Sequence, residues 1–428
     1  MVGTGLFALS AGALITTAPA AHAAYSGSNG DIAFVSTRQN SGSFGGVFQV
    51  NSQASGLGTA AGDQAATSGL TNGGSGNGID AEPFYSPDGS TVFFSSNRDT
   101  AGHWVIYDIP SGSPEPPGSA TELSQVSGSE GNDDYSPSVA PDGRTVVFNR
   151  NDVSLDTLDA RAASPASTVC TLYTPSVGLA SVNTDGGASR PLFNPVDPTQ
   201  LLYVGGDNHL HLVRGLPAPS PTAPTNPCGA VAGQNGVTDT DLSALAIDAN
   251  TTPPSTDATG SYQDENPDWS PDGLKVVFDS TRGGTNHTLW QMTNIASGTT
   301  TVTPLWSSQV GPSGGTRRSS TQPVYSPDGT QVAFVQPGQG VNTWTGMLVN
   351  LGQTLGSAQD VSLSTQGNGI VNDQPDWGPG QPNAGAPEVP LPLMLPGAAL
   401  VLGGMALFYE RRRRPILRHA PSGRRSAD

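Results

Sequence analysis

The sequence predicts an all-β fold that is built from six copies of one small unit. Each copy carries a proline, two residues of which the second is usually aromatic, a small residue and a second proline. The copies begin at Pro83, Pro137, Pro191, Pro267, Pro323 and Pro375. Short runs rich in β-branched and aromatic residues follow the copies, which is typical of strands separated by turns. The last copy lacks such a run, and a matching run stands near the N-terminus.

The turn inside the unit has a clear chemical signature. Four copies continue with Asp-Gly after their second proline, at residues 88–89, 142–143, 272–273 and 328–329. Proline fixes φ, aspartate bonds the local backbone and glycine accepts positive φ, so each residue favours a tight turn. A second strand and a less regular remainder follow. About four strands in about 50 residues is typical of one blade of a β-propeller.

The two ends of the repeated region complete one another. The copy at Pro375 ends without its second strand, whereas residues 30–38 are similar to the second strand of the fourth copy, residues 278–282 with their Ser-Thr-Arg ending. We therefore predict a six-bladed β-propeller in which residues 372–379 pair with residues 31–36. This pairing closes the ring and leaves no sheet edge open.

The string from Pro267 to Arg282 resembles the TolB-type propeller repeat, a relative of WD40 repeats. The resemblance covers roughly residues 30–380 and implies a six-bladed propeller with a water-filled central channel, without implying a reaction. The interval after the third copy is longer than the others. Its surplus falls in residues 215–262, which are rich in Pro, Thr, Ser and Ala, and we expect a flexible loop inserted there.

Both termini carry signals for export and anchoring. Residues 1–23 have an apolar run and an Ala-His-Ala cleavage site, so we expect a signal peptide before a mature domain of residues 24–380. Residues 391–409 contain no charge and are long enough to form a transmembrane helix after a linker of residues 381–390. Four arginines follow at residues 411–414, which predicts a basic cytoplasmic tail over residues 410–428.

The C-terminal region also resembles a bacterial surface-sorting tail. Residues 387–390, Pro-Glu-Val-Pro, are close to the motif of PEP-CTERM tails, and an apolar segment and an arginine cluster follow. The sequence leaves open whether a sorting enzyme cleaves this tail. In either case we expect the domain at the extracellular face of the cell membrane or at the cell surface.

The charge of the domain excludes one class of function. The chain has 18 basic and 35 acidic residues, and without the tail it keeps 11 basic and 33 acidic residues, a net charge near −22. Such a surface repels nucleic acid, whose binding needs clustered Lys and Arg. It suits cations and basic partners. We expect a monomer that binds an envelope protein, a peptide or a glycan.

Two pairs of residues were weighed as special sites. In an exported chain Cys170 and Cys228 either form a disulfide or stay as two thiols, and the oxidising environment outside the cell favours the disulfide. His209 and His211 are two residues apart, so on a strand both face the same way. Since the sequence shows no third ligand near them, we interpret them as ordinary surface histidines.

A set of acidic and amide residues stands just before the first proline of the copies. By the resemblance, this stretch enters the innermost strand beside the channel. One interpretation is a solvated loop; the other is a ring at the channel mouth that binds Ca²⁺ or a basic partner. The residues are Asp80, Glu82, Asp134, Asp264, Glu265, Gln322, Asp373 and Gln374.

An enzymatic function is the alternative to a binding scaffold. Residues 311–315 match Gly-x-Ser-x-Gly, but they lie in a Gly/Ser-rich stretch without the strand and helix that this motif needs. A lyase or glycosidase acting on extracellular polysaccharide in the channel would need convergent carboxylates and bases. Basic partners are scarce, because Arg190 is the one that stands beside a repeat proline. We therefore favour a surface-anchored binding scaffold and assign no catalytic residue.

Overall fold

The computed structural model describes most of the repeated region and neither end of the chain. The predicted signal peptide, linker, transmembrane segment and basic tail lie outside the described residues. In the part that is described, no helix is long and apolar enough to cross a membrane. The described residues are 25–37, 45–55, 57, 67–71, 78–98, 103–112, 120–125, 131–180, 189–219, 228–248, 255–256, 262–282, 287–295, 299–305, 320–337, 344–351, 359–360 and 372–380.

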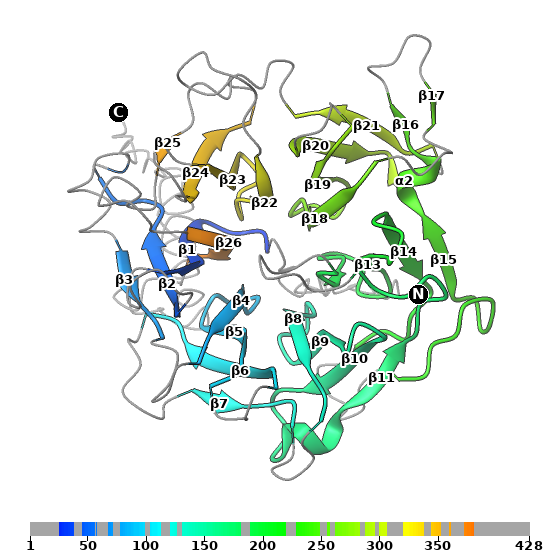
Figure 1. Ribbon diagram of the computed structural model, residues 1–428, viewed down its shortest axis with the longest axis horizontal. Coiled ribbons are helices and arrows are strands. Elements are labelled where there is room, and N and C mark those ends of the chain that lie inside the picture. The colour runs from blue at the N-terminus through cyan, green and yellow to red at the C-terminus, as the bar shows by residue number, and fades with distance from the viewer. Residues whose placement is uncertain are drawn as a thin grey trace, which may run out of the picture. The chain divides into compact units, whose positions relative to one another are not determined.

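The described strands form an all-β propeller, with sheets arranged around a common axis (Figure 1). Five sheets are each built from one stretch of the chain, and a sixth joins the two ends of the repeated region. In every sheet the strand that carries the repeat proline, or the short strand directly after it, lies at one edge and faces the axis.

The first three sheets in chain order have four strands each. The first sheet contains β4 (Asp80–Tyr85), β5 (Thr91–Ser96), β6 (Val105–Pro110) and β7 (Thr121–Glu122). The second contains β8 (Asp134–Val139), β9 (Thr145–Arg150), β10 (Ser154–Asp159) and β11 (Cys170–Tyr173). The third contains β12 (Leu192–Phe193), β13 (Leu201–Val204), β14 (Leu210–Arg214) and β15 (Thr238–Asp241). A 3₁₀ helix, η1 (Pro165–Thr168), connects β10 to β11.

The remaining sheets include the largest one and the sheet that joins the chain ends. The fourth sheet contains β18 (Asp264–Trp269), β19 (Val276–Ser280), β20 (Thr288–Thr293) and β21 (Thr301–Pro304), and β16 (Ile247–Asp248) and β17 (Ser255–Thr256) extend it. The fifth contains β22 (Thr321–Tyr325), β23 (Gln331–Pro337), β24 (Trp344–Asn350) and β25 (Gln359–Asp360). The sixth contains β26 (Asn372–Pro379), β1 (Asn29–Ser36), β2 (Gly46–Asn51) and β3 (Thr67–Gly69).

The sixth sheet confirms the predicted pairing of the two ends. β1 and β26 are antiparallel, with Ile32 opposite Trp377 and Ser36 opposite Asn372. The indole N–H of Trp377 also donates to the carbonyl of Gly30 at 3.2 Å. A side chain at Gly30 would come within 2.6 Å of the Pro379 carbonyl oxygen, so this pairing needs glycine there. The sheet that begins with the last repeat strand, β26, is thus completed by β1 from the start of the described chain.

The aromatic residue of the repeat packs between neighbouring sheets. Tyr325 of β22 is buried together with Val277 and Leu289 of the preceding sheet, and its hydroxyl accepts a hydrogen bond from the Gln291 side chain at 2.7 Å. Tyr85 of β4 lies against Gly378 of β26, where a Cβ would come within 2.6 Å of the ring. The aromatic positions therefore hold adjacent sheets together, as their place in the repeat predicts.

The Pro-Asp-Gly turns use the chemistry that the sequence predicts. Asp88 accepts a hydrogen bond from the Ser86 hydroxyl at 2.7 Å and from the Ser90 N–H at 3.0 Å. Gly89 has a φ of 67°, which is the left-handed region that favours glycine. The carboxylate is thus occupied by the turn itself.

The expected loop over residues 215–262 is wrong in part. Residues 238–241 form β15, which pairs with β14 along the outer edge of its sheet. α2 (Leu242–Leu245) follows directly, and the Asp241 side chain caps it by accepting from the Ala244 N–H at 2.8 Å. β16 then pairs in parallel with β21. The composition hid these elements because the outer strand is polar, although pairing it covers the open edge of β14.

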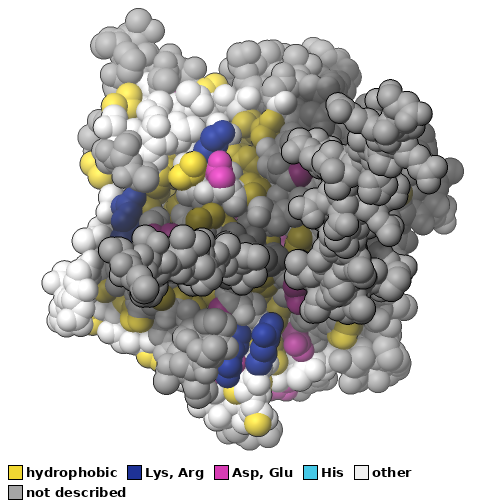
Figure 2. Space-filling view, turned by 180° about the vertical axis from the view of Figure 1, so that it is seen from behind, with side chains coloured by type: hydrophobic (Ala, Val, Ile, Leu, Met, Phe, Trp, Pro, Cys, Tyr) yellow, Lys and Arg dark blue, Asp and Glu magenta, His cyan; other side chains and the backbone are white. Residues whose placement is uncertain are grey.

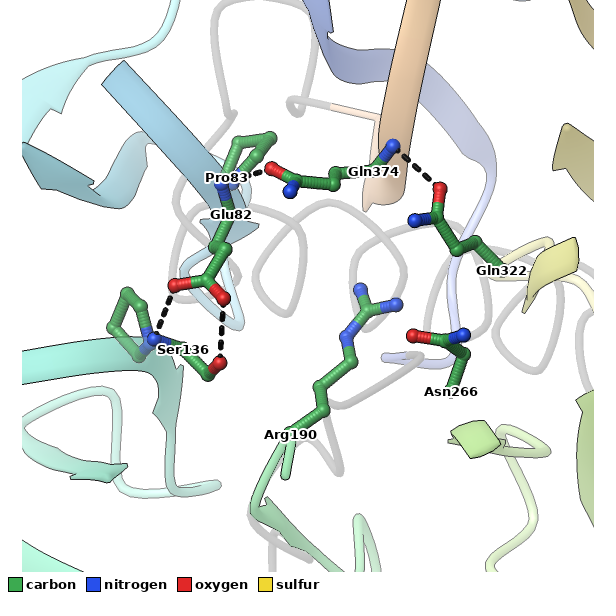
Figure 3. A pocket seen from close by; sticks show the side chains of 8 residues that line it. Glu82, Pro83, Ser136, Arg190, Asn266, Gln322 and Gln374 are labelled. Carbon is green, nitrogen blue, oxygen red and sulfur yellow. Dashed lines mark hydrogen bonds between the residues drawn. The ribbon is translucent and has the colours of Figure 1, made fainter. Parts of the chain in front are cut away.

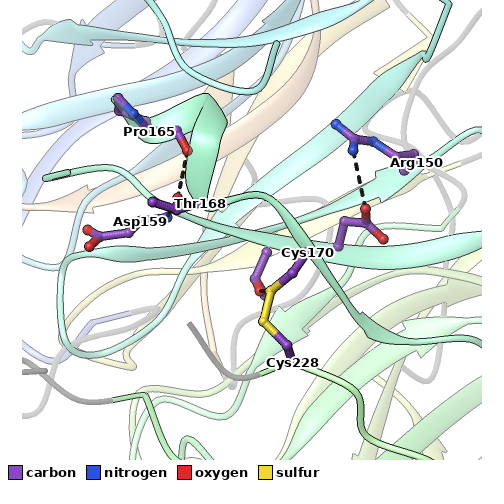
Figure 4. The surroundings of a disulfide bond; sticks show 8 residues. Arg150, Asp159, Pro165, Thr168, Cys170 and Cys228 are labelled. Carbon is purple, nitrogen blue, oxygen red and sulfur yellow. Dashed lines mark hydrogen bonds and ion pairs between the residues drawn. A yellow bond between two sulfur atoms is a disulfide. The ribbon is translucent and has the colours of Figure 1, made fainter. Parts of the chain in front are cut away.

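The structure joins Cys170 and Cys228 in a disulfide, with Cα atoms 5.9 Å apart (Figure 4). Next to the bridge, the Gly229 N–H donates to Thr171 and the Ala230 N–H donates to Leu172, both at 2.8 Å. The segment that leads to β15 is therefore fixed against β11 of the preceding sheet, and the outer edges of two sheets are linked.

We expect the double substitution Cys170→Ser with Cys228→Ser to lower the free energy of unfolding. The bridge spans a sequence separation of 58 residues, which corresponds to about 4 kcal/mol in the chain-entropy model. Urea unfolding of the oxidised parent and of the variant measures this difference, and the reduced parent serves as the matched control. An unchanged urea midpoint would show that the bridge contributes no stability.

Candidate functional site

One residue from each sheet converges on the axis of the propeller, directly before the first proline of each copy (Figure 3). We call these residues the pre-proline ring. Together with Pro83 and Pro137 they line a small pocket that is open to solvent. The pre-proline ring consists of Glu82, Ser136, Arg190, Asn266, Gln322 and Gln374.

The backbone of the ring is strained in a repeated way. All members except Arg190 have positive φ, between 48° and 54°. This region is uncommon for residues other than glycine, and a following proline restricts the backbone further. The register of the five longer inner strands, β4, β8, β18, β22 and β26, also shifts at this point, as at a β-bulge. A bulge turns a side chain out of the regular alternation, which here places it at the axis.

Hydrogen bonds between sheets stabilise this strained backbone. The Gln374 N–H donates to the side-chain oxygen of Gln322 at 2.7 Å, and the Glu82 N–H donates to the side-chain oxygen of Gln374 at 2.6 Å. The Ser136 N–H and hydroxyl donate to the Glu82 carboxylate at 2.5 and 2.7 Å. Each of these side chains therefore satisfies the backbone amide of the next sheet.

At Asn266 a neighbouring carboxylate takes over this role. Asp279 of β19 accepts the Gln322 N–H at 2.8 Å and the Asn266 side-chain amide at 2.9 Å through one oxygen. Its other oxygen contacts the His287 ring at 2.6 Å. Both oxygens of Asp279 are thus engaged by protein groups.

Arg190 breaks the pattern and points into the pocket (Figure 3). Its guanidinium donates to the Pro375 carbonyl at 3.3 Å and lies 3.5 Å from the Asp376 carboxylate, so it reaches β26 from the β12–β15 sheet. These sheets are three places apart around the ring. Arg190 therefore spans the channel, and both of its contacts are long.

Two buried carboxyl groups lie one step deeper along the inner strands. Asp376 accepts the Tyr85 N–H at 2.7 Å and Asp268 accepts the Tyr325 N–H at 2.8 Å. Burial raises the pKa of Asp268 to about 7, against the opposing effect of Arg190, and the charge of Asp376 raises it further. Burial likewise raises the pKa of Asp376 to about 6. Arg190 forms an ion pair with Asp376, and its charge also acts on Asp268.

The first described residue of the chain contacts the inner strands too. The Tyr25 hydroxyl donates to the Val139 carbonyl, and its ring meets Phe84 edge-on with the centroids 6.4 Å apart. Burial raises the pKa of Tyr25, and the charges of Asp142, Asp376 and Asp268 add to this effect. Tyr25 thus connects β4 with β8 near the buried carboxyl groups.

The structure corrects the predicted acidic ring. Glu82, Gln322 and Gln374 line the pocket. Three predicted aspartates are instead buried, each as the first residue of the innermost strand of its sheet, and each pairs with an arginine at the end of the next strand or just after it. These carboxylates do not crowd one opening, and we do not propose a calcium site there. The pairs are Asp80 with Arg98 (2.8 Å), Asp134 with Arg150 (2.7 Å) and Asp264 with Arg282 (2.5 Å).

Glu265 and Asp373 also lie outside the set of pocket-lining residues. Glu265 is half-buried opposite Asp279. Burial raises the pKa of Glu265, the Asp279 charge raises it further and His287 lowers it. Asp373 accepts the Gln374 N–H at 3.0 Å. Asp373 therefore contacts the backbone of the ring, and neither residue lines the pocket.

The sequence analysis missed Ser136 and Asn266, and it noted Arg190 only as an isolated base. The signal that identifies them is position: each precedes a repeat proline, as Glu82 does. Asp268 and Asp376 follow the same prolines by one residue. A search by position in the repeat, rather than by charge, finds the whole pocket.

The face opposite to that of Figure 1 has a different character. Figure 2 shows that its described basic and acidic side chains lie in small separate groups of both signs.

Neither protein-family models nor curated protein sequences match the chain. Solved structures of similar fold include TolB from Acinetobacter baumannii, with 15% identity, a TM-score of 0.49 and coverage of 82% of this chain and 67% of that one. A structure assigned as TolB from Agrobacterium tumefaciens has 15% identity, a TM-score of 0.42 and coverage of 78% and 88%. An oligogalacturonate lyase from Vibrio parahaemolyticus has 12% identity, a TM-score of 0.33 and coverage of 65% and 76%. These neighbours share a propeller-like arrangement of sheets, and nothing about ligand or activity follows from them.

We expect Asp268→Asn to remove a pH-dependent loss of stability. The pKa of Asp268 in the folded protein, about 7, lies above its ordinary value of 3.8. The native state therefore binds the proton more tightly, so this contribution is present at low pH and is lost as the pH rises through about 7. The asparagine can still accept the Tyr325 N–H. Because each pKa unit corresponds to about 1.4 kcal/mol, the variant gains a few kcal/mol over the parent at slightly alkaline pH.

Urea unfolding of both proteins across this pH range measures the effect. The two stability curves should converge at acidic pH and separate as the pH rises. Parallel curves would mean that Asp268 titrates normally in the folded protein.

Proposed function

We propose that the chain is a binding scaffold displayed outside the cytoplasm, whose channel takes up a basic group of a protein or peptide partner. We read the six sheets as six blades, closed by the pairing of β26 with β1. The observation that carries the proposal is the excess of carboxyl groups around the pocket: Glu82 lines it, Asp268 and Asp376 are buried on the inner strands, and Arg190 is the one cation among the lining residues.

The excess of carboxyl groups favours a cationic ligand. Arg190 is the cation whose charge acts on both Asp268 and Asp376, and burial raises the pKa of both carboxyl groups. A second cation near them would favour their ionised forms and release the protons that burial retains. An anionic ligand would instead add to charges that Arg190 already fails to balance.

The geometry of Arg190 leaves acceptors for such a group. Its contacts with the Pro375 carbonyl and the Asp376 carboxylate are 3.3 and 3.5 Å, at or beyond the long end of hydrogen-bond distances. A lysine ammonium or a terminal amine has several donors and no acceptor. It can therefore use the carbonyl and carboxylate oxygens that Arg190 engages weakly.

The pocket is less suited to the alternative, a lyase or glycosidase acting on polysaccharide. Glycosidases use two carboxyl groups on either side of the scissile bond. Glu82 is the one carboxylate among the pocket-lining residues, and Ser95 and Ser136 engage both of its oxygens. The lining residues include no His, Lys or Tyr that would act as a base. Binding without catalysis fits this set better.

Titration calorimetry with defined peptides tests the channel. The probes are extended peptides with a lysine or a free terminal amine, each compared with its acetylated counterpart on the full chain. We expect the amine form to bind about tenfold or more tightly, since a charged hydrogen bond contributes about 1.5–3 kcal/mol. Asp376→Asn should reduce this preference, whereas Glu122→Gln on the exposed outer strand β7 should leave it unchanged.

Two results would contradict the proposal. Equal binding of acetylated and free peptides would exclude recognition of a basic group. Binding that survives both Asp376→Asn and Glu82→Gln would place the binding site outside the channel.

The proposed location rests on the two predicted terminal segments and on the disulfide, which is typical of oxidising compartments. We expect protease added to intact cells to cut the propeller and to spare an epitope placed after Arg425. The matched control is the same treatment of lysed cells, in which the epitope should disappear. Loss of the epitope in intact cells would show that the tail is exported or removed by a sorting enzyme.

A further inference from the structure

The β12–β15 sheet carries a second group of ionisable side chains, and none of its members lines the channel pocket. Asp207 lies in the turn between β13 and β14, and His209 and His211 stand at the start of β14. Asp239 and Asp241 lie on β15, where Asp241 is directly opposite His211. Both histidines are buried, with 6% and 5% of their surface exposed, so their interpretation as surface histidines is wrong.

Three of these residues present ligand atoms at one point. The atoms of Asp207, His211 and Asp241 that can bind a metal ion all lie within 4.8 Å of one another. The Nε2 atom of His211 is 3.1 Å from Oδ2 of Asp207. Two ligands that bind a tetrahedral zinc ion at 2.0–2.1 Å lie about 3.3 Å apart. The pair is therefore already at the separation that a zinc ion requires.

The second nitrogen of His211 is held by groups that orient the ring. Its Nδ1 atom lies 3.3 Å from Oδ1 of Asp239. The other oxygen of Asp239 accepts the Tyr203 and Tyr173 hydroxyls at 2.6 and 2.8 Å. The Tyr203 ring also stacks on His211, with 5.1 Å between the centroids. A carboxylate that orients the far nitrogen of a histidine is typical of metal sites.

Asp241 is oriented in the same manner. One oxygen accepts the Ala244 N–H at 2.8 Å and the other contacts Nδ1 of His209 at 2.8 Å. Each carboxylate oxygen has room for a further partner, because it offers two lone pairs. The side chain is thus positioned without being saturated.

The turn that carries Asp207 allows its carboxylate to lie close to the His211 ring. A Cβ atom at Gly205 would lie 2.5 Å from Oδ1 of Asp207 and 3.0 Å from Nε2 of His211. Any other residue at position 205 would therefore push these two groups apart. Asn208, in the same turn, has a φ of 60°. The backbone accepts an unusual conformation where the two ligands meet.

We propose that Asp207, His211 and Asp241 bind a divalent transition-metal ion, with zinc as the best-fitting candidate. Imidazole nitrogen combined with carboxylate oxygen suits Zn²⁺, whereas Ca²⁺ takes six or more oxygens. The side chains of Asp207 and Asp241 are 36% and 28% exposed, so the ion reaches the site from solvent. Three protein ligands leave a fourth position for water or for a donor group of a ligand.

A second cluster, Glu265 with Asp279 and His287, also has its ligand atoms within 4.8 Å. It is less suitable because Asp279 already accepts the Gln322 N–H and the Asn266 amide through one oxygen and contacts His287 through the other. Binding a metal there would disrupt the support of the pre-proline ring. The contrast identifies the Asp207 cluster as the better site.

Without a metal, the same contacts describe a protonated His211 between two carboxylates. Zinc titration of the full oxidised chain by calorimetry separates the two cases. We expect one zinc ion per chain and no detectable binding at this site in Asp207→Asn or Asp241→Asn, which keep the side-chain volume. Asp239→Asn should weaken binding by about 10–100-fold, as expected when the group that orients a ligand is lost.

The control variant is His103→Ala, which removes a histidine from a partly exposed pair with Asp133 and should bind zinc like the parent. Circular dichroism and the melting temperature in the presence of a chelator show whether each variant is folded. Zinc binding that persists in both Asp207→Asn and Asp241→Asn, or a parent that binds no zinc, would overturn the proposal.

Crystals of the parent grown with zinc give an independent result. The anomalous signal should place the ion between Nε2 of His211 and the carboxylates of Asp207 and Asp241. An ion found only at Glu265, Asp279 and His287, or no ion in the protein, would show that the Asp207 cluster is a histidine ion pair.

Discussion

The antiparallel pairing of β1 with β26 is the interaction on which the other features depend. It joins segments about 340 positions apart in the chain, such as Ile32 and Trp377, and its loop-closure entropy is recovered only if all sheets between them pack correctly. Once the ring is closed, the innermost strands surround one axis. The side chains that precede the repeat prolines then meet at a single pocket. A register change at this seam would turn the side chains of β26, Gln374 among them, to the opposite face of the sheet.

The pre-proline ring shows how a strained backbone position becomes a site. The positive φ at Glu82 and its equivalents turns side chains toward the axis and exposes backbone amides that need acceptors. Gln322, Gln374 and Glu82 supply those acceptors to the next sheet. The backbone of Arg190 does not have positive φ, and its side chain does not accept a backbone N–H of the next sheet. The ring member without the strained backbone, Arg190, is also the one that carries the positive charge in the pocket.

The sequence allowed the repeat, the turns and the closing pair to be predicted, because each depends on local chemistry or on a pattern that recurs. Asp-Gly at residues 88–89 forms a turn wherever it stands, and residues 31–36 are recognisable as a missing strand. The polar strand β15 was missed because its residues, Thr-Asp-Thr-Asp, carry no apolar alternation. Pairing with β14, rather than composition, makes it a strand.

The candidate site was predicted only in part for a related reason. Charge alone selected Asp80 and Glu82 equally, although they are two residues apart on the same strand. The structure separates them: Asp80 pairs with Arg98, two residues beyond the end of the adjoining strand β5, whereas Glu82 lines the pocket at the axis. Which carboxylate meets an arginine depends on strand register, and a single sequence does not show register directly. The ligands of the Asp207 cluster, about 30 residues apart in the chain, meet for the same reason.

The links between β11 and β15 join two neighbouring sheets at their outer edges. The disulfide fixes the segment before β15 to β11, and Asp239 of β15 is held by tyrosines from both sheets. These two neighbouring sheets therefore behave as one stiff arc, braced at the rim as well as near the axis. The seam formed by β1 and β26, where strands from the two ends of the repeated region pair, lies in another sheet, so opening the ring there would leave this link intact.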